Sequence, residues 1–266
     1  MAVDYDLEVE EGEELSEKIF QQIETAWSAD AEGYDQSIQR QLSNTKDVQH
    51  WQDELRQVLG PGPLNVLDVG CGPGFFSIML ARLQHRVTAV DGAEGMVECA
   101  RRNILNEGMH ANIYLGDAVL LDQEKEGSFD AIVSRDVVWT IYDPEKAFAR
   151  WKDLLKEGGK VVIFDGDYRR DQSSLRYYAL KLVSNLINLF IEGTRPRKRR
   201  HGTAGNGFEQ LPMIRHKRPQ HDQELLLKAG FSKVEVTKDR FRNSPGRLEF
   251  WRYAYQGKKF RVIAYK

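Results

Sequence analysis

One nine-residue segment restricts the fold of this 266-residue chain more than any other. It reads Val66-Leu-Asp-Val-Gly-Cys-Gly-Pro-Gly74 and runs directly into the apolar sequence Phe75-Phe-Ser-Ile-Met-Leu80. An apolar strand therefore ends in a loop with three glycines, and a helix follows. Glycines permit positive φ and let a ligand approach the backbone without a Cβ in the way. Open α/β sheets bind ligands at such loops, at the carboxyl ends of their strands.

Short apolar runs alternate with helical segments around this loop. Asp143–Lys156 is the clearest helix, because Asp143 suits the N-cap, Pro144 suits the first helical position and Gly158-Gly159 supplies a stop. Strands separated by helices imply right-handed crossovers and a mostly parallel sheet with helices on both faces. We therefore expect an α/β, Rossmann-like doubly wound fold. The strand candidates are Leu64–Val69, Arg86–Val90, Asn112–Leu115, Phe129–Ser134, Lys160–Asp165, Lys233–Thr237 and Phe260–Ala264.

The segments outside this alternation predict two additions to the core. Residues 13–28 place Leu15, Ile19, Ile23 and Trp27 on one helical stripe. After the fifth strand candidate, about 55 residues pass before the next helix–strand unit, which is too long for a structureless loop. We expect a helical cap there, with an amphipathic helix over roughly Gln172–Ile191. The predicted division is an N-terminal helical segment (1–50), the α/β core (51–166), an inserted substrate cap (167–221), and the last helix and two strands of the core (222–266).

Composition excludes several other classes of protein. The two cysteines, Cys71 and Cys99, have no metal-ligand spacing, so we expect no metal site and no disulfide framework. No apolar run approaches the length of a membrane span, and we expect no membrane partner. The first residues are acidic where a signal peptide would be basic and then apolar. The predicted location is therefore cytoplasmic.

The net charge of −2 hides an asymmetry between two segments. Residues 1–24 carry nine acidic side chains against one lysine, whereas in residues 195–218 Glu209 is the only acid among many Lys and Arg. The run Arg195-Pro-Arg-Lys-Arg-Arg200 is typical of a nucleic-acid or anionic-substrate surface, or of a solvated loop. Arg215–Arg218 could receive an anion in the same way. No aromatic stacking platform interleaves with these charges, which makes a nucleic-acid partner unlikely.

The glycine loop lacks the features of two phosphate-binding motifs. A P-loop would end in Gly-Lys-Ser/Thr, and a dinucleotide fingerprint would have its third glycine at position 75, where this chain has Phe75. Asp68 beside the loop suits a cationic ligand better than a pyrophosphate. These residues argue against a nicotinamide-dependent oxidoreductase and favour a ligand that carries an ammonium or sulfonium.

Acidic residues follow the next two strand candidates. Asp91 ends the second and could accept hydrogen bonds from both hydroxyls of a ribose, each worth about 1.5–3 kcal/mol because the acceptor is charged. The alternative is that Asp91 caps the following helix. Asp117, after the third strand candidate, is placed to accept a hydrogen bond from an exocyclic amine, or it lies in a surface turn. Together the acidic strand ends predict a nucleoside site.

Four motifs in this order resemble those of class I S-adenosylmethionine-dependent methyltransferases, most closely the small-molecule group that includes ubiquinone-type methyltransferases. They are Val66–Gly74, Val90-Asp-Gly-Ala-Glu-Gly-Met96, Gly116-Asp-Ala118 and Phe129-Asp-Ala-Ile-Val-Ser134. The match covers roughly residues 60–166. The resemblance implies a seven-stranded sheet with a reversed last strand. It also implies a methyl transfer from S-adenosyl-L-methionine to O, N, S or C of a small molecule, with S-adenosyl-L-homocysteine as product.

The resemblance also implies a set of cofactor-binding residues. The glycine loop lies under the methionine part, with Ser134 and Arg135 on the same side, while Met96 covers the adenine. Trp27 and Tyr34 resemble the N-terminal segment that closes over the cofactor in related enzymes. The complete predicted set is Trp27, Tyr34, Asp68, Gly70, Cys71, Gly72, Gly74, Asp91, Gly92, Met96, Asp117, Ala118, Ser134 and Arg135.

The catalytic residues are left open by the sequence. A general base is needed only if the attacking atom is protonated at working pH. The candidates for a base or a substrate anchor are Asp136, Asp165, Asp167 and His221, and Trp139 and Tyr142 could form an aromatic wall. The alternative functions are a nucleic-acid-binding protein or an RNA methyltransferase that uses residues 195–218. A monomer and a homodimer are both compatible with the sequence.

Overall fold

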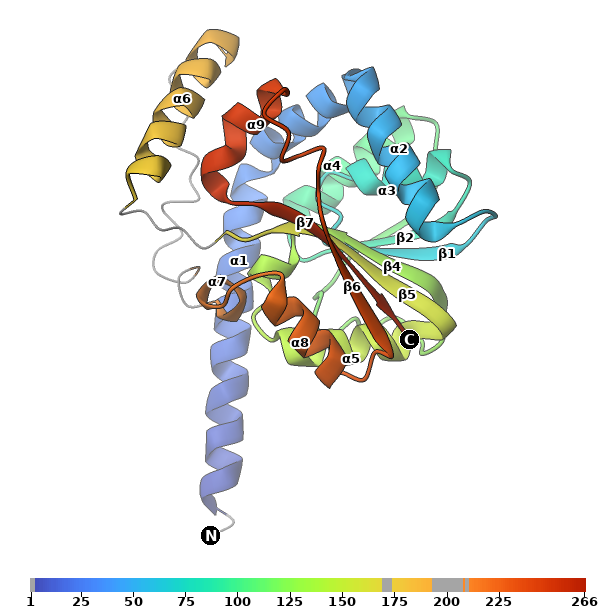
Figure 1. Cartoon of the computed structure of the whole chain (residues 1–266). Helices are drawn as coiled ribbons and strands as arrows, with labels where there is room; N and C mark the ends of the chain where they lie inside the picture. The colour runs from blue at the N-terminus through green and yellow to red at the C-terminus, as the bar shows by residue number, and fades with distance from the viewer. Residues whose placement is uncertain (1–2, 169–173, 193–207, 209–210) are drawn as a thin grey trace.

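The structure is a computed structural model, and it describes residues 3–168, 174–192, 208 and 211–266. A seven-stranded sheet with the order β3-β2-β1-β4-β5-β7-β6 forms its centre (Figure 1). Strand β7 runs antiparallel to both β5 and β6, and the other pairs are parallel. The Rossmann-like sheet with a reversed last strand is thus confirmed. Its strands are β1 Asn65–Val69, β2 Arg86–Asp91, β3 Asn112–Leu115, β4 Phe129–Arg135, β5 Leu155–Gly166, β6 Lys233–Lys238 and β7 Lys259–Tyr265.

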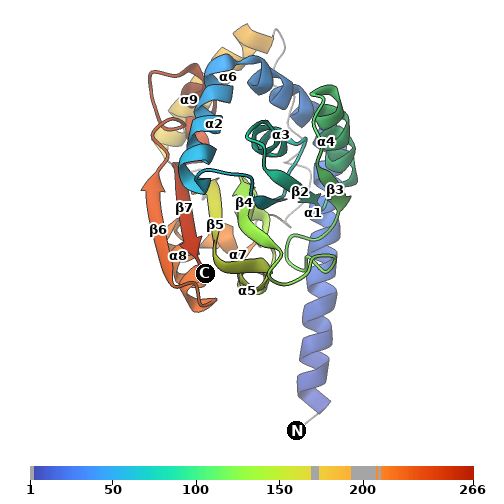
Figure 2. The same cartoon turned by 90° about the vertical axis from the view of Figure 1, so that its right-hand side faces the viewer.

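Helices cover both faces of the sheet (Figure 2). One face packs on α5 and α8 through residues such as Leu67 and Ile163, and the other packs on α2, α3 and α4 through Val66 and Val162. The two apolar layers enclose strands that are buried on both sides, as in other parallel sheets. The helices are α1 Val3–Ser43, α2 Thr45–Leu59, α3 Phe75–Arg82, α4 Glu94–Asn106, α5 Pro144–Leu154, α6 Leu175–Glu192, α7 Pro212–Arg215, α8 Gln220–Lys228 and α9 Leu248–Tyr253, with short 3₁₀ turns η1 Val138–Thr140 and η4 Ala254–Gln256.

Strand β5 corrects one prediction from the sequence. Asp143 does cap α5, since its side chain accepts a hydrogen bond from the Lys146 backbone N–H at 3.0 Å. The helix, however, ends at Leu154, and Gly158-Gly159 lie inside β5 rather than at a helix stop. The register of β4 against β5 shifts between Phe129 and Ala131, so these glycines lie where the pairing is irregular. Glycines in a strand often mark such an irregularity, which the sequence pattern does not distinguish from a helix end.

The strand order places the loops after β1 and β4 on either side of a crevice. Chain connections leave β1 toward β2 and β3 on one side and return to β4 on the other. Open α/β sheets bind ligands at this reversal point. Helix α1 lies across this edge, and its N-terminal half extends away from the rest of the molecule (Figure 1). No helix among the described residues combines the length and apolar character required to cross a membrane.

Candidate functional site

A cavity of about 110 Å³ lies at the reversal point, and we call it the first cavity. The loops after β1, β2, β3 and β4 form its floor and sides, and α1 forms the opposite wall. Ten of the residues predicted to hold a cofactor line it. They are Trp27, Tyr34, Gly70, Gly72, Asp91, Gly92, Met96, Asp117, Ala118 and Arg135. The other lining residues are Phe20, Ile23, Glu24, Ala93, Val119, Asp136, Val137, Thr140, Ile141 and Tyr142.

Two glycines of the loop after β1 lack a side chain for different steric reasons. Gly70 has φ +69°, and a Cβ there would lie 2.3 Å from a methyl carbon of Val137, in the loop after β4. Gly72 has φ +51°, and a Cβ there would meet only the Tyr34 ring at 3.9 Å. Gly70 therefore allows two strand-end loops to pack together, whereas Gly72 keeps the backbone open to the first cavity.

Asp91 connects the loops after β1 and β2. Its carboxylate accepts hydrogen bonds from the backbone N–H of Gly72 at 2.8 Å and of Ala93 at 2.9 Å. Burial raises the pKa of this carboxyl, and the two N–H donors oppose the shift by stabilising the charged form. Asp91 therefore lines the first cavity and braces Ala93, the residue before α4, although no side chain caps that helix. Ribose binding by Asp91 stays a prediction.

Asp117 occupies the corresponding position after β3. One carboxylate oxygen accepts from the Val119 backbone N–H at 2.7 Å, and the other accepts from the Tyr142 hydroxyl at 2.5 Å. Tyr142 also lines the first cavity, and burial together with Asp117 raises the pKa of its hydroxyl. The contact fixes Asp117 at the cavity edge. Tyr142 lines the first cavity and Trp139 the second, so the structure does not bring the two together in the one aromatic wall predicted from the sequence.

Helix α1 supplies one wall of the first cavity. Trp27 and Tyr34 lie edge to face with ring centroids 5.9 Å apart, and Trp27 meets Trp139 in the same way at 6.3 Å. Phe20 and Glu24 also line the cavity but were not among the predicted residues. The predicted apolar stripe of α1 consists of Leu15, Ile19, Ile23 and Trp27. Phe20 directly follows Ile19 in the sequence and was not part of that stripe.

Contacts with α4 hold this part of α1 against the core. Arg102 pairs with Asp35 at 2.8 Å and with Glu32 at 3.0 Å. Asn103 donates to the other oxygen of Asp35 at 2.6 Å. Oxygens of Glu32 and Asp35 also lie within 4.8 Å of the Cys99 sulfur, a grouping that could hold a cation, but both acids already pair with the Arg102 guanidinium.

Four residues of the predicted set do not line the first cavity: Asp68, Cys71, Gly74 and Ser134. Asp68 is 1% exposed and accepts a hydrogen bond from the Ser77 hydroxyl of α3 at 2.6 Å. Side chains alternate along a strand, and Asp68 faces α3 while the loop two residues later reaches the ligand edge. The structure therefore places Asp68 beneath the glycine loop, in contact with the protein interior.

A second cavity of about 210 Å³ adjoins the first. The two share three lining residues, namely Tyr34, Arg135 and Asp136. The ends of α1 and α2, the residues after β4 and β5, and the segment between β6 and β7 surround it. Its other lining residues are Ser37, Gln41, Asp47, Trp51, Trp139, Tyr168, Phe241, Arg242, Asn243, Arg247, Glu249, Phe250, Tyr253, Ala254, Gln256, Gly257 and Lys259.

Asp136 lies between the two cavities and is surrounded by cations. Arg242 Nη1 reaches both of its carboxylate oxygens, at 2.9 and 3.0 Å, and Lys259 Nζ lies 3.4 Å from one of them. The Tyr168 hydroxyl donates to Asp136 at 2.6 Å and accepts from Lys259 at 2.5 Å. Arg242, Lys259 and Arg135 together hold the pKa of this carboxyl well below its usual range, although burial acts in the opposite direction. Asp136 is therefore ionised near neutral pH.

Arg135 reaches from this cluster toward both cavities. Its guanidinium lies over the rings of Phe75, Phe76 and Trp51, at 4.7 to 5.3 Å from their centroids. Its Nη2 donates weakly to Gln41 at 3.3 Å, whereas the buried Nη1 has no hydrogen-bond partner among the described residues. A buried guanidinium nitrogen without a partner is costly. Because this atom has almost no exposed surface, a ligand oxygen could reach it only after the surrounding side chains move.

The remaining catalytic candidates do not line either cavity, although Asp165 contacts Trp139 and Arg242 of the second cavity's lining. Asp165 is fully buried and pairs with Arg218 at 2.9 Å, and Arg218 also pairs with Asp222. Neither Asp167 nor His221 lines either cavity, and the His221 ring stacks on His216. Of the four candidates, the structure brings only Asp136 to the cavities.

The segment between β6 and β7 was not assigned to the site from the sequence. Eleven lining residues of the second cavity come from residues 241–259, including α9. The predicted substrate cap, residues 167–221, supplies Tyr168 to the lining. A connection of 20 residues between two antiparallel strands is far longer than a hairpin needs, and that length was the available signal.

The predicted basic surface is only partly described. Arg195–Arg200 lie outside the described residues. In the second basic run, Arg215 and Lys217 are exposed, but Arg218 is 3% exposed and engaged with two carboxylates. The prediction that Arg218 could receive an anionic substrate is therefore wrong, because its charge is already balanced in the interior.

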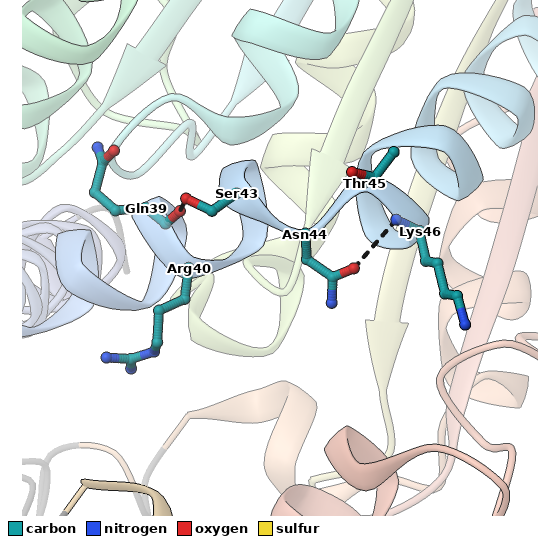
Figure 3. Close-up of a pocket in the computed structure, with 6 residues that line it drawn as sticks. All are labelled: Gln39, Arg40, Ser43, Asn44, Thr45 and Lys46. Carbon is teal, nitrogen blue, oxygen red and sulfur yellow. Dashed lines mark hydrogen bonds between the residues drawn. The ribbon is translucent and has the colours of Figure 1, made fainter.

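A third concavity lies at the turn between α1 and α2 (Figure 3). Its six lining residues are exposed, and the hydrogen bonds there are local. Ser43 donates to the Gln39 carbonyl at 2.8 Å, and the Asn44 side chain accepts from the Lys46 backbone N–H at 3.1 Å as the N-cap of α2. The contacts are those of a helix–helix turn, and nothing in them recognises a ligand.

Comparison with known proteins agrees with this geometry. A family described as "Methyltransferase domain" matches residues 67–163, from β1 to β5. This segment is similar to that family, and we call residues 67–163 the methyltransferase domain after this similarity. It contains the glycine loop and the residues that follow β2, β3 and β4, whereas α1 and the segment between β6 and β7 lie outside the match.

The methyltransferase domain is similar to part of the ubiquinone biosynthesis O-methyltransferase of Xanthomonas axonopodis pv. citri (strain 306). The two are 37% identical over 105 residues, which is 40% of this chain and 44% of that protein. The chain thus matches less than half the length of this curated relative. The N-terminal helix and the C-terminal part must be interpreted from the structure itself.

Solved structures share the fold over most of the chain. A putative S-adenosyl-L-methionine-dependent methyltransferase from Methanococcus maripaludis aligns with a TM-score of 0.58 and 20% identity, covering 89% of this chain and 92% of that one. Phosphoethanolamine N-methyltransferase 2 of Haemonchus contortus, in complex with S-adenosyl-L-methionine, aligns with a TM-score of 0.56 and 20% identity, over 81% and 52% of the chains. At these identities the likeness concerns the fold of the methyltransferase domain.

Proposed function

We propose that this protein transfers a methyl group from S-adenosyl-L-methionine to a small molecule. The cofactor would bind in the first cavity and the acceptor in the second. The observation that carries the proposal is the wall of Tyr34, Arg135 and Asp136 common to both cavities. The two cavities meet at these residues, so an acceptor atom that passes between them could approach the methyl carbon in line with the departing sulfur.

The residues of the first cavity fit this cofactor chemically. Asp91 would accept from the ribose hydroxyls, and Asp117 would accept from the adenine amine while the Ala118 backbone N–H donates to the ring. Met96, 3% exposed, would pack on the adenine. The open backbone at Gly72 would lie under the methionine part, and Arg135 Nη1 would bind its carboxylate. When bound, the cofactor supplies a methyl group that its sulfonium already activates.

The first cavity must widen to admit this ligand. Its volume of about 110 Å³ is below the roughly 300–1,000 Å³ usual for ligand pockets. Helix α1 forms a whole wall of the cavity and lies outside the methyltransferase domain. We therefore propose that α1 moves outward as the cofactor enters and then closes over it, which gives residues 1–50 the role expected from the sequence.

The charges around Asp136 restrict how a proton could leave the acceptor. An ionised carboxylate that already pairs with Arg242 and Lys259 is a poor base, so Asp136 is a positioning residue. Burial and the nearby Arg242 lower the pKa of Lys259, which also lines the second cavity. We propose that the acceptor attacks through a lone pair that is free at neutral pH, because Lys259 pairs with Asp136 in its charged form and cannot take up a proton in that form.

The alternative functions are nucleic-acid binding and RNA methylation through residues 195–218. None of the contacts in either cavity requires a nucleic acid, and the part of the chain that could bind one electrostatically, Arg195–Arg200, lies outside the described residues. A gel-shift titration with RNA over salt remains the discriminating measurement, since phosphate contacts weaken steeply as salt rises.

Calorimetry with S-adenosyl-L-homocysteine tests the cofactor site directly. We expect Asp91→Ala to weaken binding about 10- to 100-fold, because it removes charge-assisted hydrogen bonds worth about 1.5–3 kcal/mol each. Asp53→Ala is the matched control, since Asp53 is an exposed acid of α2 that pairs only with exposed Arg56. Circular dichroism of each variant verifies folding. Unchanged affinity in folded Asp91→Ala protein would refute the cofactor placement.

The acceptor can then be found by its reaction. Metabolite pools from the source cell would be incubated with the protein and S-adenosyl-L-methionine, and production of S-adenosyl-L-homocysteine would be followed. Fractions that support turnover by the wild type and not by Asp91→Ala contain the acceptor. If no fraction raises turnover above the cofactor's background hydrolysis although the cofactor binds, the proposed transfer is wrong.

A further inference from the structure

Helix α6 (Leu175–Glu192) has two faces with different surroundings. One face packs on α9, where the Ser184 hydroxyl, 2% exposed, donates to the Arg252 carbonyl at 2.6 Å. One turn later, Asn188 accepts from Arg252 Nε at 2.7 Å. Figure 1 shows α6 at the periphery of the molecule, beside α9. The side of α6 opposite Ser184 therefore faces solvent.

The solvent-facing side of α6 is apolar, which is the reverse of the usual arrangement. Six large apolar residues between 43% and 88% exposed occupy it: Leu175, Tyr178, Leu182, Leu186, Leu189 and Phe190. We call these residues the outer face of α6. At 100° per residue they span an arc of about 120°, and they extend for about 22 Å along the helix. A continuous apolar strip of this kind marks an interaction site, unlike scattered exposed leucines.

The charges of α6 indicate what covers the outer face. Arg176 and Lys181 flank the arc on its two sides, and residues 175–190 contain no Asp or Glu. Long cationic side chains beside an apolar strip can reach lipid headgroups while the strip enters the acyl boundary. The sequence beyond the helix adds charge of the same sign, with five Lys and Arg in residues 195–200.

We propose that α6 binds the surface of an anionic lipid bilayer, lying in the plane of the membrane with its outer face inserted. A second copy of this chain fits less well, because no Asp or Glu in residues 175–190 could pair with Arg176 or Lys181 of the other copy. The helix would lie on the bilayer and not cross it, since no described helix is both long and apolar enough to cross a membrane. The expectation of no membrane partner, which rested on the absence of such a span, would then be wrong for surface binding.

This docking would bring the bilayer close to the second cavity. Helix α9 lies between them, because its outer contacts hold α6 and its residues Glu249, Phe250 and Tyr253 line the cavity. An acceptor dissolved in the membrane would thus have a short path to the site. The docking itself rests on the outer face of α6 and does not depend on the methyl-transfer proposal.

Vesicle sedimentation of the full chain tests the docking. We expect the protein to sediment with vesicles of equal parts phosphatidylglycerol and phosphatidylcholine, and to remain in solution with phosphatidylcholine alone. The double variant Leu182→Glu/Leu186→Glu should lose at least tenfold in partitioning, because it places two acids in the strip. Leu105→Glu is the matched control: Leu105 is 75% exposed on α4, and its replacement should change nothing.

The cations have their own test. Arg176→Gln and Lys181→Gln should each weaken partitioning about fivefold, and raising the salt should reduce the difference from wild type. Thermal unfolding verifies that every variant is folded. The proposal is overturned if the wild type ignores anionic vesicles, if the double variant binds them equally, or if light scattering shows a dimer that the double variant abolishes in the absence of lipid.

Discussion

Asp68 shows how the two-residue period of a strand decides the role of a side chain. Val66 and Asp68 face α3, whereas Leu67 and Val69 belong to the apolar layer under α5. The carboxyl is therefore enclosed by the interior. Burial raises its pKa to about 7, although the Ser77 hydroxyl and Arg135 both favour the charged form. Its charge is a cost to the folded state rather than a ligand contact.

This raised pKa predicts how stability depends on pH. The folded state holds the Asp68 proton more tightly than the unfolded state does, so this contribution is complete below about pH 4 and is lost as the pH rises through 7. Asp68→Asn removes the titration. We expect the unfolding free energy of the wild type to fall by about 3 kcal/mol relative to the variant between pH 5 and pH 8. Urea unfolding of both proteins at four pH values measures this difference. If the unfolding free energies of the wild type and the variant change equally with pH, the prediction is contradicted.

A pair of glycines separates backbone strain from packing. Gly70 and Gly108 have nearly equal φ, +69° and +65°, but a Cβ at Gly108 would meet nothing within 4 Å, whereas at Gly70 it would overlap Val137. Gly108→Ala should therefore cost about 1–2 kcal/mol from the left-handed conformation alone. Gly70→Ala should cost at least about 1 kcal/mol more from overpacking and should weaken S-adenosyl-L-homocysteine binding, because the loops after β1 and β4 that line the first cavity must separate. Equal losses in urea unfolding would show that the Val137 contact yields freely.

At the scale of elements, the contacts of α1 with α4 control one wall of the first cavity. Arg102 binds Glu32 and Asp35 of α1, whereas its neighbour Arg101 donates to the Ile113 carbonyl of β3 at 2.8 Å. The two arginines thus hold different elements. A loss at Arg102 should loosen α1 selectively.

Hydrogen exchange measures this loosening. We expect Arg102→Met to lower protection of backbone amides in residues 28–43 by a factor of about two to five, since a partly exposed ion pair contributes up to about 1 kcal/mol. Arg101→Met should leave the protection of that segment as in the wild type. Equal effects of the two variants on α1 would mean that its apolar contacts, and not Arg102, hold it in place.

The fold was more predictable than the site. Each of the seven strands contains apolar residues at two-residue or continuous spacing, and all were expected within one residue at their starts except β5. That strand begins at Leu155, five residues before the predicted start at Lys160, because Lys156–Gly159 carry no strand pattern. Asp91 at the end of β2 and Asp117 after β3 were predicted to lie near each other, because the carboxyl ends of parallel strands meet at one sheet edge. Both line the first cavity.

The second cavity was not predictable in the same way. It assembles the ends of α1 and α2 with residues 241–259, which lie about 200 positions apart in the chain. Contacts such as Arg247 with Asp47 and Arg242 with Asp136 follow from the reversed β7, and no periodicity in the sequence predicts them. The residues before β7 also lack a regular hydrophobic pattern. Helix α9 in this segment is only six residues long, which is too short to show a helical period.

At the scale of the whole molecule, one buried arginine joins the two ends of the core. Arg218 is 3% exposed and pairs with Asp165 at the end of β5 and with Asp222 in α8. It also lies over the Phe260 ring of β7, 5.3 Å from its centroid. This cluster fixes the C-terminal helix and strands against the methyltransferase domain. The sequence suggested a surface cation, because an isolated arginine before a helix shows nothing of its burial.

Removing this arginine should destabilise the whole chain. Arg218→Met leaves two buried carboxylates without a counterion, and breaking a buried pair in this way costs about 3–5 kcal/mol. Arg215→Met, three residues earlier and exposed, should stay within about 0.5 kcal/mol of the wild type in urea unfolding. The triple variant Asp165→Asn/Arg218→Met/Asp222→Asn should recover part of the loss, because no charge remains buried. If Arg218→Met unfolds at the same urea concentration as Arg215→Met, the cluster does not hold the C-terminal elements, and the apolar layer under α8 does so alone.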